Sequence, residues 1–330
     1  MNAKRILIIG GTGFIGGNLV RFLSEQGETV IVVHRKDSRL EHLQGLSYQA
    51  AEGDITDRLS IQHVVHHMAA ENDIMINLAS CDLPGKRYRT VREQVNVDGA
   101  ALVASIARKK KMRLVHISSS MAVGFPDNGV IADEAFTFNG YDHHYAVTKY
   151  RGECSVMEEI HKGLDAVIAI PCSTVGPHGM KREQKQMFQG IKKNALWYYP
   201  PGGLCLTCSD DLVRGIMLCC TKGATGQRYI LGGMNITYKE YLSEIAQCLH
   251  AAAPSIGIPS LVVHAYGRAM DVLAHCIHKD VGVSREIALL VVKKLYYSSE
   301  CAIKELGYSI THWRETIRQT VGWLQTNNEL

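Results

Sequence analysis

Several hallmarks of membrane and secreted proteins are missing from this sequence of 330 residues. No apolar stretch reaches the roughly 18 residues that a membrane-spanning helix needs. The first residues, Met1 to Arg5, lead straight into the apolar run Ile6–Ile9, which is too short for the core of a signal peptide. We therefore expect a cytoplasmic protein with no transmembrane span.

A strong excess of charge of one sign is also missing. The chain has 36 Lys and Arg against 32 Asp and Glu, a net charge of +4. Its one basic run, Arg108 to Lys111, fits the solvated end of a helix, so we expect no nucleic-acid partner. With 46% hydrophobic and 21% charged residues, the composition is close to the globular average and provides for a sizeable core.

The sequence has little that could bind a metal. Its ten cysteines include one CxxC pair, Cys205 and Cys208, with no second pair at zinc-ribbon spacing. Both fall in an expected strand, where side chains three residues apart point to opposite faces. His63 and His67 share one face of an expected helix, but no third ligand is nearby, so that face is interpreted as solvated. We expect reduced thiols and no metal.

Up to residue 175, short apolar runs alternate with helical patterns, and no internal repeat is present. The expected strands are Ile6–Ile9, Thr29–Val33, Ser47–Ala51, Ile74–Leu78, Leu114–Ile117 and Ala166–Ile170. The expected helices between them are Gly16–Gln26, Arg58–Ala69, Val91–Ala107 and Ala146–His161. This alternation indicates an α/β fold, a Rossmann-type doubly wound parallel sheet with helices on both faces.

The first strand is followed directly by a glycine loop. Gly10, Gly13 and Gly16 have the GxxGxxG spacing and stand between the first expected strand and helix. Glycine at these positions permits a tight turn and a close approach of the backbone to a pyrophosphate. The helix N-terminus adds free N–H groups for the phosphates. The loop therefore predicts that the chain binds a dinucleotide.

The end of the second expected strand bears on which dinucleotide is bound. An NAD site usually has Asp or Glu there to bond the ribose 2′-hydroxyl, whereas this chain has Arg35 and Lys36 and no acid before Asp37. Arg and Lys attract a 2′-phosphate, so NADP(H) is favoured and NAD(H) is the alternative. The competing interpretation is that Arg35 and Lys36 merely belong to a solvated loop. Asp54 is placed to accept from the adenine amino group.

The chain is expected to form two lobes. Residues 1–175 form the dinucleotide-binding domain, which takes back strands from about 204–233. Residues 176–203, rich in Pro and Gly, and residues 234–330, mostly helical, form a smaller substrate-binding lobe.

Tyr145 and Lys149 lie one turn apart at the start of an expected helix. An ammonium beside a phenol favours the phenolate and lowers its pKa from the usual value of about 10. Tyr145 is therefore a candidate general acid or base. The serines Ser118 to Ser120 end a neighbouring expected strand and are the nearest candidates for a substrate-binding hydroxyl.

Taken in order, the motifs of this chain resemble those of the extended short-chain dehydrogenases/reductases, the NAD-dependent epimerase/dehydratase superfamily. The motifs are Gly10–Gly16, Gly53-Asp54, Asn77–Ser80, Asn96–Gly99, Ser118-Ser119, Tyr145 with Lys149, and Ile170–Pro177. Segments Gln227–Gly233 and Lys293–Ser299 are similar to the dihydroflavonol-reductase-like branch, which includes bacterial hopanoid-associated sugar epimerases. The resemblance spans nearly the whole chain and specifies the superfamily far better than the substrate.

The resemblance implies an NAD(P)-dependent oxidoreductase. In this family's mechanism Ser119 would bond the substrate carbonyl oxygen, Tyr145 would give or take its proton, and Lys149 would bond the nicotinamide ribose. Counting back from Gly124 selects Ser119, with its two neighbours as alternatives. The residues expected to contact the cofactor are Gly10, Thr12, Gly13, Phe14, Ile15, Gly16, Arg35, Lys36, Asp54, Ile55, Leu78, Ala79, Ser80, Tyr145, Lys149, Pro171 and Cys172. Asn96 is expected to tether backbone, and Glu153 to be structural.

The chain departs from the family pattern in three places. Val123 replaces a tyrosine of many sugar-modifying members, and no Arg precedes Asp211, where nucleotide-sugar enzymes often have one for a pyrophosphate. His143 and His144 stand where proline is usual; we interpret them as exposed loop residues, with contact to the pocket as the alternative. These departures favour a ketone or aldehyde reductase, or alcohol dehydrogenase, for a small, fairly apolar substrate. A nucleotide-sugar epimerase or 4-ketoreductase is the alternative, ahead of a non-catalytic dinucleotide-binding protein.

The substrate side is expected to come from residues 81–90, 177–205 and the helices after 254. Trp197, Tyr198 and Tyr199 are interpreted either as walls of an apolar pocket or as packing between the lobes. Ile256–Ile277 is interpreted as a packed helix or one facing a second copy in a homodimer, and alternatively as a docking surface for an apolar substrate.

Overall fold

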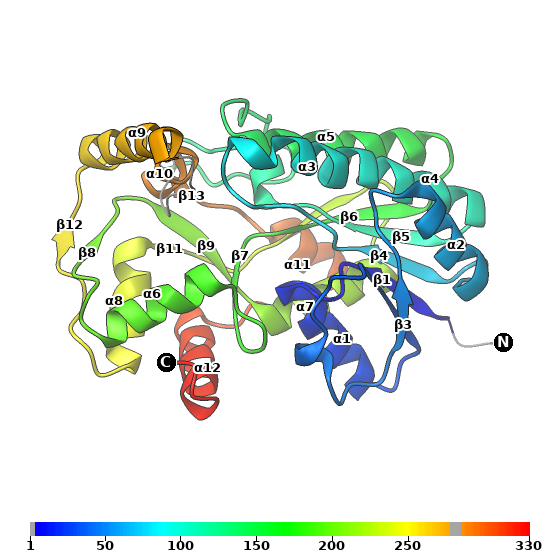
Figure 1. Ribbon diagram of the computed structural model, residues 1–330, viewed down its shortest axis with the longest axis horizontal. Coiled ribbons are helices and arrows are strands. Elements are labelled where there is room, and N and C mark those ends of the chain that lie inside the picture. Colours follow the sequence, from blue (N-terminus) through cyan, green and yellow to red (C-terminus); the bar gives the residue numbers. More distant parts are fainter. Residues whose placement is uncertain (1–3, 278–284) are drawn as a thin grey trace.

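The computed structural model describes residues 4–277 and 285–330, with the backbone alone for 274–277. The chain forms a large parallel sheet covered by helices on both faces, and a smaller lobe beside it (Figure 1). No helix of the described part is long and apolar enough to cross a membrane.

The large sheet has seven parallel strands in the order β10-β6-β5-β4-β1-β2-β3. The strands are β1 (Ile6–Ile9), β2 (Val30–His34), β3 (Gln49–Glu52), β4 (Ile74–Asn77), β5 (Arg113–Ile117), β6 (Ala166–Pro171) and β10 (Arg228–Leu231). This is the doubly wound Rossmann arrangement that the sequence predicts. The strand order reverses between β1 and β4, and ligands of such sheets bind at the carboxyl ends of the strands at this point.

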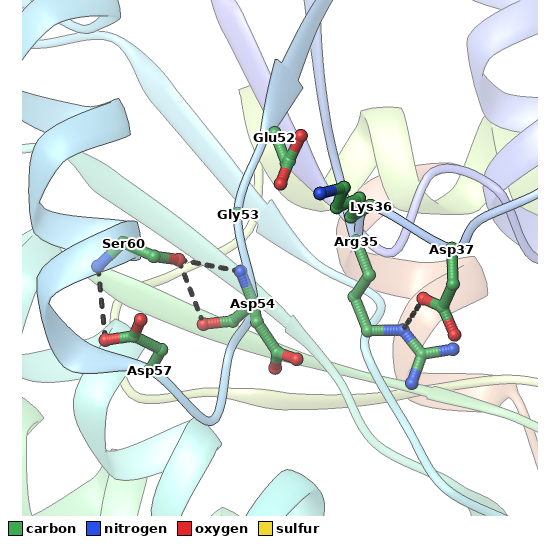
Figure 2. A pocket seen from close by; sticks show the side chains of 8 residues that line it. All are labelled: Arg35, Lys36, Asp37, Glu52, Gly53, Asp54, Asp57 and Ser60. Atoms are coloured by element: carbon green, nitrogen blue, oxygen red, sulfur yellow. Dashed lines mark hydrogen bonds and ion pairs between the residues drawn. The ribbon is translucent and has the colours of Figure 1, made fainter.

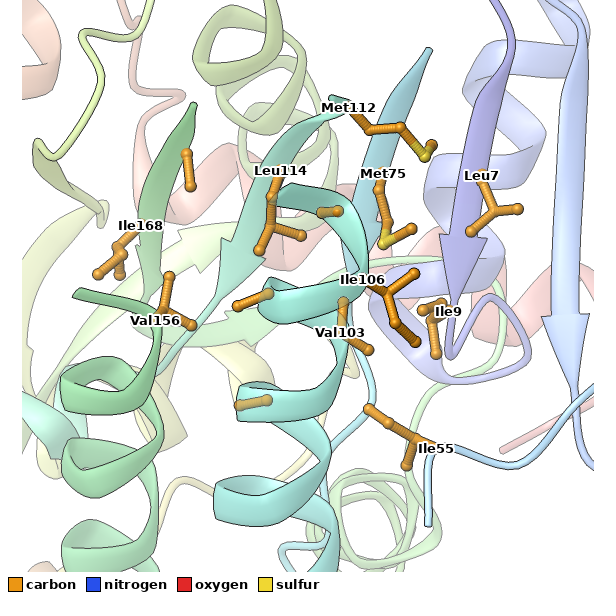
Figure 3. Close-up of a cluster of buried hydrophobic side chains, with 14 of the residues drawn as sticks. Leu7, Ile9, Ile55, Met75, Val103, Ile106, Met112, Leu114, Val156 and Ile168 are labelled. Atoms are coloured by element: carbon orange, nitrogen blue, oxygen red, sulfur yellow. The ribbon is translucent and has the colours of Figure 1, made fainter. Parts of the chain in front are cut away.

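Alternate side chains of the strands build two separate cores. Leu7 and Ile9 of β1 point to one face and pack under α4 (Figure 3), whereas Ile6 and Ile8 point to the other face. The first face carries α2 (Arg58–Met68), α4 (Gly99–Lys110) and α5 (His144–His161). The second carries α1 (Phe14–Glu25), α7 (Ser209–Thr221) and α11 (Glu300–Leu306). Strands buried on both faces explain the continuous apolar runs of the sequence.

The smaller lobe has its own sheet and hydrophobic core. That sheet comprises β7 (Ser173–Val175), β9 (Gly203–Cys208), β11 (Met234–Thr237) and β13 (Lys294–Leu295). Strands β8 (Tyr198–Tyr199) and β12 (Ile256–Gly257) pair with each other in a separate two-stranded sheet. Its helices are α6 (Arg182–Lys192), α8 (Tyr238–Cys248), α9 (Ser260–Ile277), α10 (Arg285–Val291) and α12 (Trp313–Thr326).

One strand lies in a different sheet from the one expected. Within 204–233, β10 takes the edge of the large sheet, but β9 pairs with β7, β11 and β13 in the second sheet. All six residues of β9 are buried. A continuous apolar run indicates a central strand but does not specify its partners, which here depend on where β7 leaves the large sheet.

Helix α5 packs closely against the helical segment that precedes β5. The helix expected from Val91 is present as α3 (Arg89–Glu93), a π-helical turn η3 (Gln94–Asp98) and α4. Gly152 of α5 lies against η3, where an added Cβ would overlap the carbonyl oxygen of Asn96. The short elements η1 (Glu41–Leu43), η2 (Lys86–Tyr88) and η4 (Ser120–Ala122) are 3₁₀ turns in the connections.

We expect Gly152→Ala to destabilise the fold. The new methyl group forces α5 away from η3, and overpacking of this kind costs about 1–3 kcal/mol. Gly322→Ala in α12 is a matched control, because no atom lies within 4 Å of the position that a Cβ would take there. That control should gain about 0.5–1 kcal/mol from helix propensity. Urea unfolding of both variants measures the difference, and equal stabilities would contradict the close packing.

Candidate active site

Glycines bring two loops into contact at the carboxyl ends of β1 and β4. Gly10 has a φ of +86°, and a Cβ there would lie 2.7 Å from the backbone nitrogen of Ala79. A Cβ on Gly16 would overlap the carbonyl oxygen of Gly10. Gly13 is the N-cap of α1 and offers no side chain to its first turn. The N–H groups of this turn, which includes Phe14 and Ile15, therefore suit a pyrophosphate.

A cavity of about 550 Å³ opens beyond the second strand (Figure 2). It is lined by Arg35, Lys36, Asp37, Glu52, Gly53, Asp54, Asp57 and Ser60. Arg35 Nε lies 3.4 Å from Asp37 Oδ1, and Lys36 and Glu52 line the same cavity. Sequence reasoning missed the three acids Asp37, Glu52 and Asp57 as part of this site. The cationic side chains of this cavity, Arg35 and Lys36, therefore share it with carboxylates.

The other residues expected to contact the cofactor lie either in the core or at the carboxyl ends of the strands. Ile55 is buried, and its side chain packs against Gly99 in the core rather than lining the cavity. Leu78 and Ala79 follow β4 and are half-buried. Pro171 ends β6 and Cys172 follows it, so both lie at the carboxyl end of the sheet.

Lys149 is buried behind Tyr145, one turn further along α5. Its side chain is 1% exposed, and its Nζ donates a hydrogen bond to the carbonyl oxygen of Ile117 at 2.8 Å. Burial lowers the pKa of Lys149 to about 8, although the carboxylates of Glu153 and Asp82 oppose the shift. Lys149 can therefore exchange a proton near neutral pH.

The hydroxyls of Ser80 and Ser119 lie close enough to the Tyr145 hydroxyl to favour its phenolate. Burial raises the pKa of Tyr145, and the negative charge of Asp82 raises it further, while Ser80, Lys181 and Ser119 act in the opposite direction. The sequence predicts instead that Lys149 lowers this pKa. The difference has a physical cause, because desolvation of the phenolate dominates and the Lys149 ammonium is directed to Ile117.

The three consecutive serines at the end of β5 have different partners. Ser118 donates a hydrogen bond to the buried Glu153, and Ser120 lies close enough to Cys172 and Tyr297 to oppose the rise of their pKa values. Ser119 is the serine that reaches Tyr145, and its Oγ also accepts from the backbone N–H of Met121 at 3.3 Å. The structure thus brings together Ser119, Tyr145 and Lys149.

Glu153 supports the site from behind. The carboxylate is 3% exposed and accepts from Arg228 Nε of β10 at 2.9 Å as well as from Ser118. Burial raises the pKa of Glu153, and the Arg228 charge opposes that shift. These contacts are those of a structural residue, and Arg228 was not identified from the sequence because it lies 75 positions away.

Asn96 tethers the loop after β4 to α5. Its Oδ1 accepts from the backbone N–H of Cys81 at 2.8 Å, and its Nδ2 donates to the Cys81 carbonyl and to Thr148 Oγ1, both at 3.0 Å. Asp82 follows in this loop and forms an ion pair with Lys181. Asp82 and Lys181 therefore stand near Tyr145, and neither was singled out from the sequence.

The interpretation of His143 and His144 as exposed loop residues is wrong. His143 is 6% exposed and caps α5, because its Nδ1 accepts from the backbone N–H of Ala146 at 3.3 Å. Burial lowers the pKa of both imidazoles. His144 Nδ1 lies 3.4 Å from Nη1 of the buried Arg92, which also pairs with Glu286 of α10 at 3.2 Å. Helix capping, rather than exposure, accounts for a histidine in place of proline.

The aromatic residues after 196 do not wall a pocket around Tyr145. Trp197 and Tyr198 are 58% and 39% exposed and lie at β8, at the end of the smaller lobe far from α5 (Figure 1). Tyr199 packs in the core of that lobe. Among residues 4–277 and 285–330, no group of three His, Cys, Asp or Glu could hold a metal ion.

The buried Lys149 predicts a pH-dependent stability. Its pKa falls from 10.5 to about 8 on folding. Between these values the unfolded chain binds more protons, so the free energy of unfolding rises with pH by up to about 3 kcal/mol. Lys149→Met should abolish this rise, whereas Lys193→Met, which removes an exposed lysine, should not. Urea unfolding at pH 7, 8.5 and 10 tests this; a parallel pH dependence of parent and Lys149→Met would contradict it.

Comparisons with known proteins indicate the family of this chain. The family model described as "NAD dependent epimerase/dehydratase family" matches residues 6–232. A "Putative dihydroflavonol 4-reductase" of Synechocystis sp. is 26% identical over 98% of this chain and 96% of the relative. "Sterol demethylase protein B" of Methylococcus capsulatus is 28% identical over 81% of each chain. The crystal structure of dTDP-glucose 4,6-dehydratase from Bacillus anthracis, in complex with NAD, has a TM-score of 0.78 at 17% identity and covers 99% of this chain and 98% of that one.

The last likeness shows the fold alone, whereas the family model covers more than half of the chain. This chain belongs to the NAD-dependent epimerase/dehydratase family, the extended short-chain dehydrogenases/reductases, and is an NAD(P)-dependent oxidoreductase.

Proposed function

We propose that this protein is an NADP(H)-dependent reductase of ketones or aldehydes, working reversibly as an alcohol dehydrogenase on a small, fairly apolar substrate. The observation that carries the proposal is the nearness of the Ser119 hydroxyl to the Tyr145 phenol, with Lys149 one helical turn behind. A phenol and a second hydroxyl that converge on one point suit a carbonyl oxygen. The cofactor lies along residues 1–175, and the substrate is bounded by residues 176–203 and 234–330.

The chemistry divides among three side chains. Ser119 donates a hydrogen bond to the substrate oxygen and orients it. Tyr145 transfers its phenolic proton to that oxygen during reduction and takes it back during oxidation. Lys149, with a pKa of about 8, resupplies the proton to Tyr145. The nicotinamide, when bound, supplies or accepts the hydride.

The substrate class is proposed from the relatives and from β9. The two curated relatives carry names that refer to a dihydroflavonol and a sterol, both largely apolar ring systems. Residues Leu204 to Leu206 of β9 are buried and apolar, and no arginine stands before Asp211 to bind a substrate pyrophosphate. A nucleotide-sugar epimerase or 4-ketoreductase is therefore the weaker candidate. A non-catalytic dinucleotide-binding protein would not need the buried Lys149.

The preference for NADP(H) depends on the cavity of Figure 2. Arg35 and Lys36 line it and can pair with a 2′-phosphate. Arg35 lies 3.4 Å from Asp37, so a 2′-phosphate must draw it away from that carboxylate. The pair is exposed, and such pairs contribute roughly 0–1 kcal/mol, so a doubly charged phosphate can compete with it.

We expect tighter binding of NADPH than of NADH, by at least about tenfold. Arg35→Ala should remove most of that difference, because it deletes a charge-assisted contact to the 2′-phosphate. Arg39→Ala, which removes an exposed arginine outside the cavity lining, should leave it intact. Fluorescence titration with both cofactors measures the affinities. Equal affinities in the parent, or no change in Arg35→Ala, would refute the preference.

Tyr145→Phe should lower kcat by about 10²–10⁴-fold, because it keeps the ring and removes the transferable proton. Turnover is measured as NADPH consumption on a panel of apolar ketones and aldehydes, with NADPH affinity as a second readout that should not change. Tyr150→Phe, on the same helix with its ring stacked on Phe138, is the matched control and should retain activity. Retention of more than about a third of parental turnover by Tyr145→Phe would reject the assigned chemistry.

A further inference from the structure

The chain passes from the large sheet to the second sheet at Cys172. Strand β6 ends at Pro171 and β7 begins at Ser173. Strand β7 runs parallel to β9, with Ser173 opposite Leu206. If this parallel register is continued by one residue toward the N-terminus of both strands, Cys172 lies opposite Cys205.

The geometry of this pair suits a disulfide. Neighbouring strands lie about 4.7–4.9 Å apart, and disulfides join Cα atoms about 4.4–6.8 Å apart. Each thiol lies close enough to shift the pKa of the other. A Cβ added to Gly232 would lie 2.9 Å from the sulfur of Cys205 and 3.1 Å from that of Cys172. Glycine at 232 therefore leaves both sulfurs in one shared space.

The two thiols are chemically different. The backbone N–H of Gly233 donates to Cys205 Sγ at 3.3 Å, and the Cys205 thiol donates to the carbonyl oxygen of Tyr297 at 4.0 Å. The neighbouring Cys172 thiol lowers the pKa of Cys205, whereas burial raises the pKa of Cys172. The anion is thus stabilised on Cys205, which makes it the nucleophile of the pair.

The pair also touches the proposed active site. The Cys172 thiol lies near Ser120, the residue after the proposed substrate-binding Ser119, and Ser120 opposes the rise of its pKa. Cys172 itself follows the carboxyl end of β6, where the cofactor is expected. A disulfide between Cys172 and Cys205 of β9 would change the position of Cys172 relative to Ser120 and to the expected cofactor.

We propose that Cys172 and Cys205 form a peroxide-sensitive dithiol whose closure to a disulfide weakens cofactor binding. The Cys205 thiolate attacks one peroxide oxygen, the O–O bond breaks, hydroxide leaves and a sulfenic acid forms. The sulfur of Cys172 then attacks Cys205, the S–O bond breaks and water leaves. In sum, two thiols lose two electrons and two protons, and one hydrogen peroxide becomes two waters. The effect on the cofactor rests on the proposed function, whereas the disulfide does not.

The test uses the full-length, fully reduced protein. Hydrogen peroxide is titrated in, the protein is denatured with N-ethylmaleimide, and the intact mass and peptide map are recorded. We expect a species lighter by about 2 Da before alkylation, with a cross-link between Cys172 and Cys205. NADPH titration of this species should give a dissociation constant at least about threefold higher, restored by a thiol reductant.

Cys208→Ala is the matched control, because Cys208 is equally buried three residues along β9 and points to the opposite face. It should oxidise like the parent, whereas Cys205→Ala should form no such disulfide and keep its NADPH affinity after peroxide. Cys219 and Cys220 of α7, whose pKa values burial raises, should stay reduced within the same parent sample. The parent peptide map locates the cross-link even if a variant fails to fold.

Three results would overturn the proposal. Oxidation of Cys172 and Cys205 to separate sulfinic acids, or a cross-link at other cysteines, would reject the dithiol. A disulfide that leaves NADPH affinity unchanged would reject the coupling to the cofactor. If the reduced parent bound neither NADPH nor NADH, the proposed function would fail instead, and the mass measurement would still decide the disulfide.

Discussion

The side-chain amide of Asn96 is the constraint on which the active site depends. It bonds both backbone groups of Cys81 and the hydroxyl of Thr148, so one residue fixes the loop after β4 relative to α5. Ser80 lies in that loop and Tyr145 on that helix. The π-helical turn η3 carries Asn96, and the close approach of Gly152 to its carbonyl oxygen keeps it there. Loss of this packing would separate the hydroxyls that converge on Tyr145.

Electrostatics behind Tyr145 are set by burial. Lys149 has lost most of its contact with water, and the protein supplies one carbonyl oxygen and the nearby carboxylate of Glu153 instead. Glu153 in turn is held by Ser118 and Arg228. Desolvation prevails over these compensations, so the pKa of Lys149 falls and the pKa of Tyr145 rises. Both groups are therefore closer to neutral here than simple proximity of a phenol and an ammonium suggests.

The cofactor cavity shows the same competition at the surface. Arg35 and Lys36 provide positive charge, while Asp37 and Glu52 stand beside them (Figure 2). Exposed pairs of this kind are weak and screened by salt, so they leave the cations available to a stronger anion. The sequence at the end of β2 therefore indicates the positive charges of the site, but not the carboxylates that the fold brings near them.

Local sequence patterns determined the large sheet, its helices and the position of the glycine loop, because apolar periodicity and glycine spacing act within a few residues. They also brought Tyr145 and Lys149 together, since four residues make one helical turn. The partners of β9, the burial of His143, and the contacts of Arg92, Arg228 and Cys172 were decided only by the tertiary structure. Each depends on residues distant in sequence, such as Glu286 for Arg92 and Glu153 for Arg228. Desolvation, which sets the pKa values at the site, likewise arises only when the core closes around them.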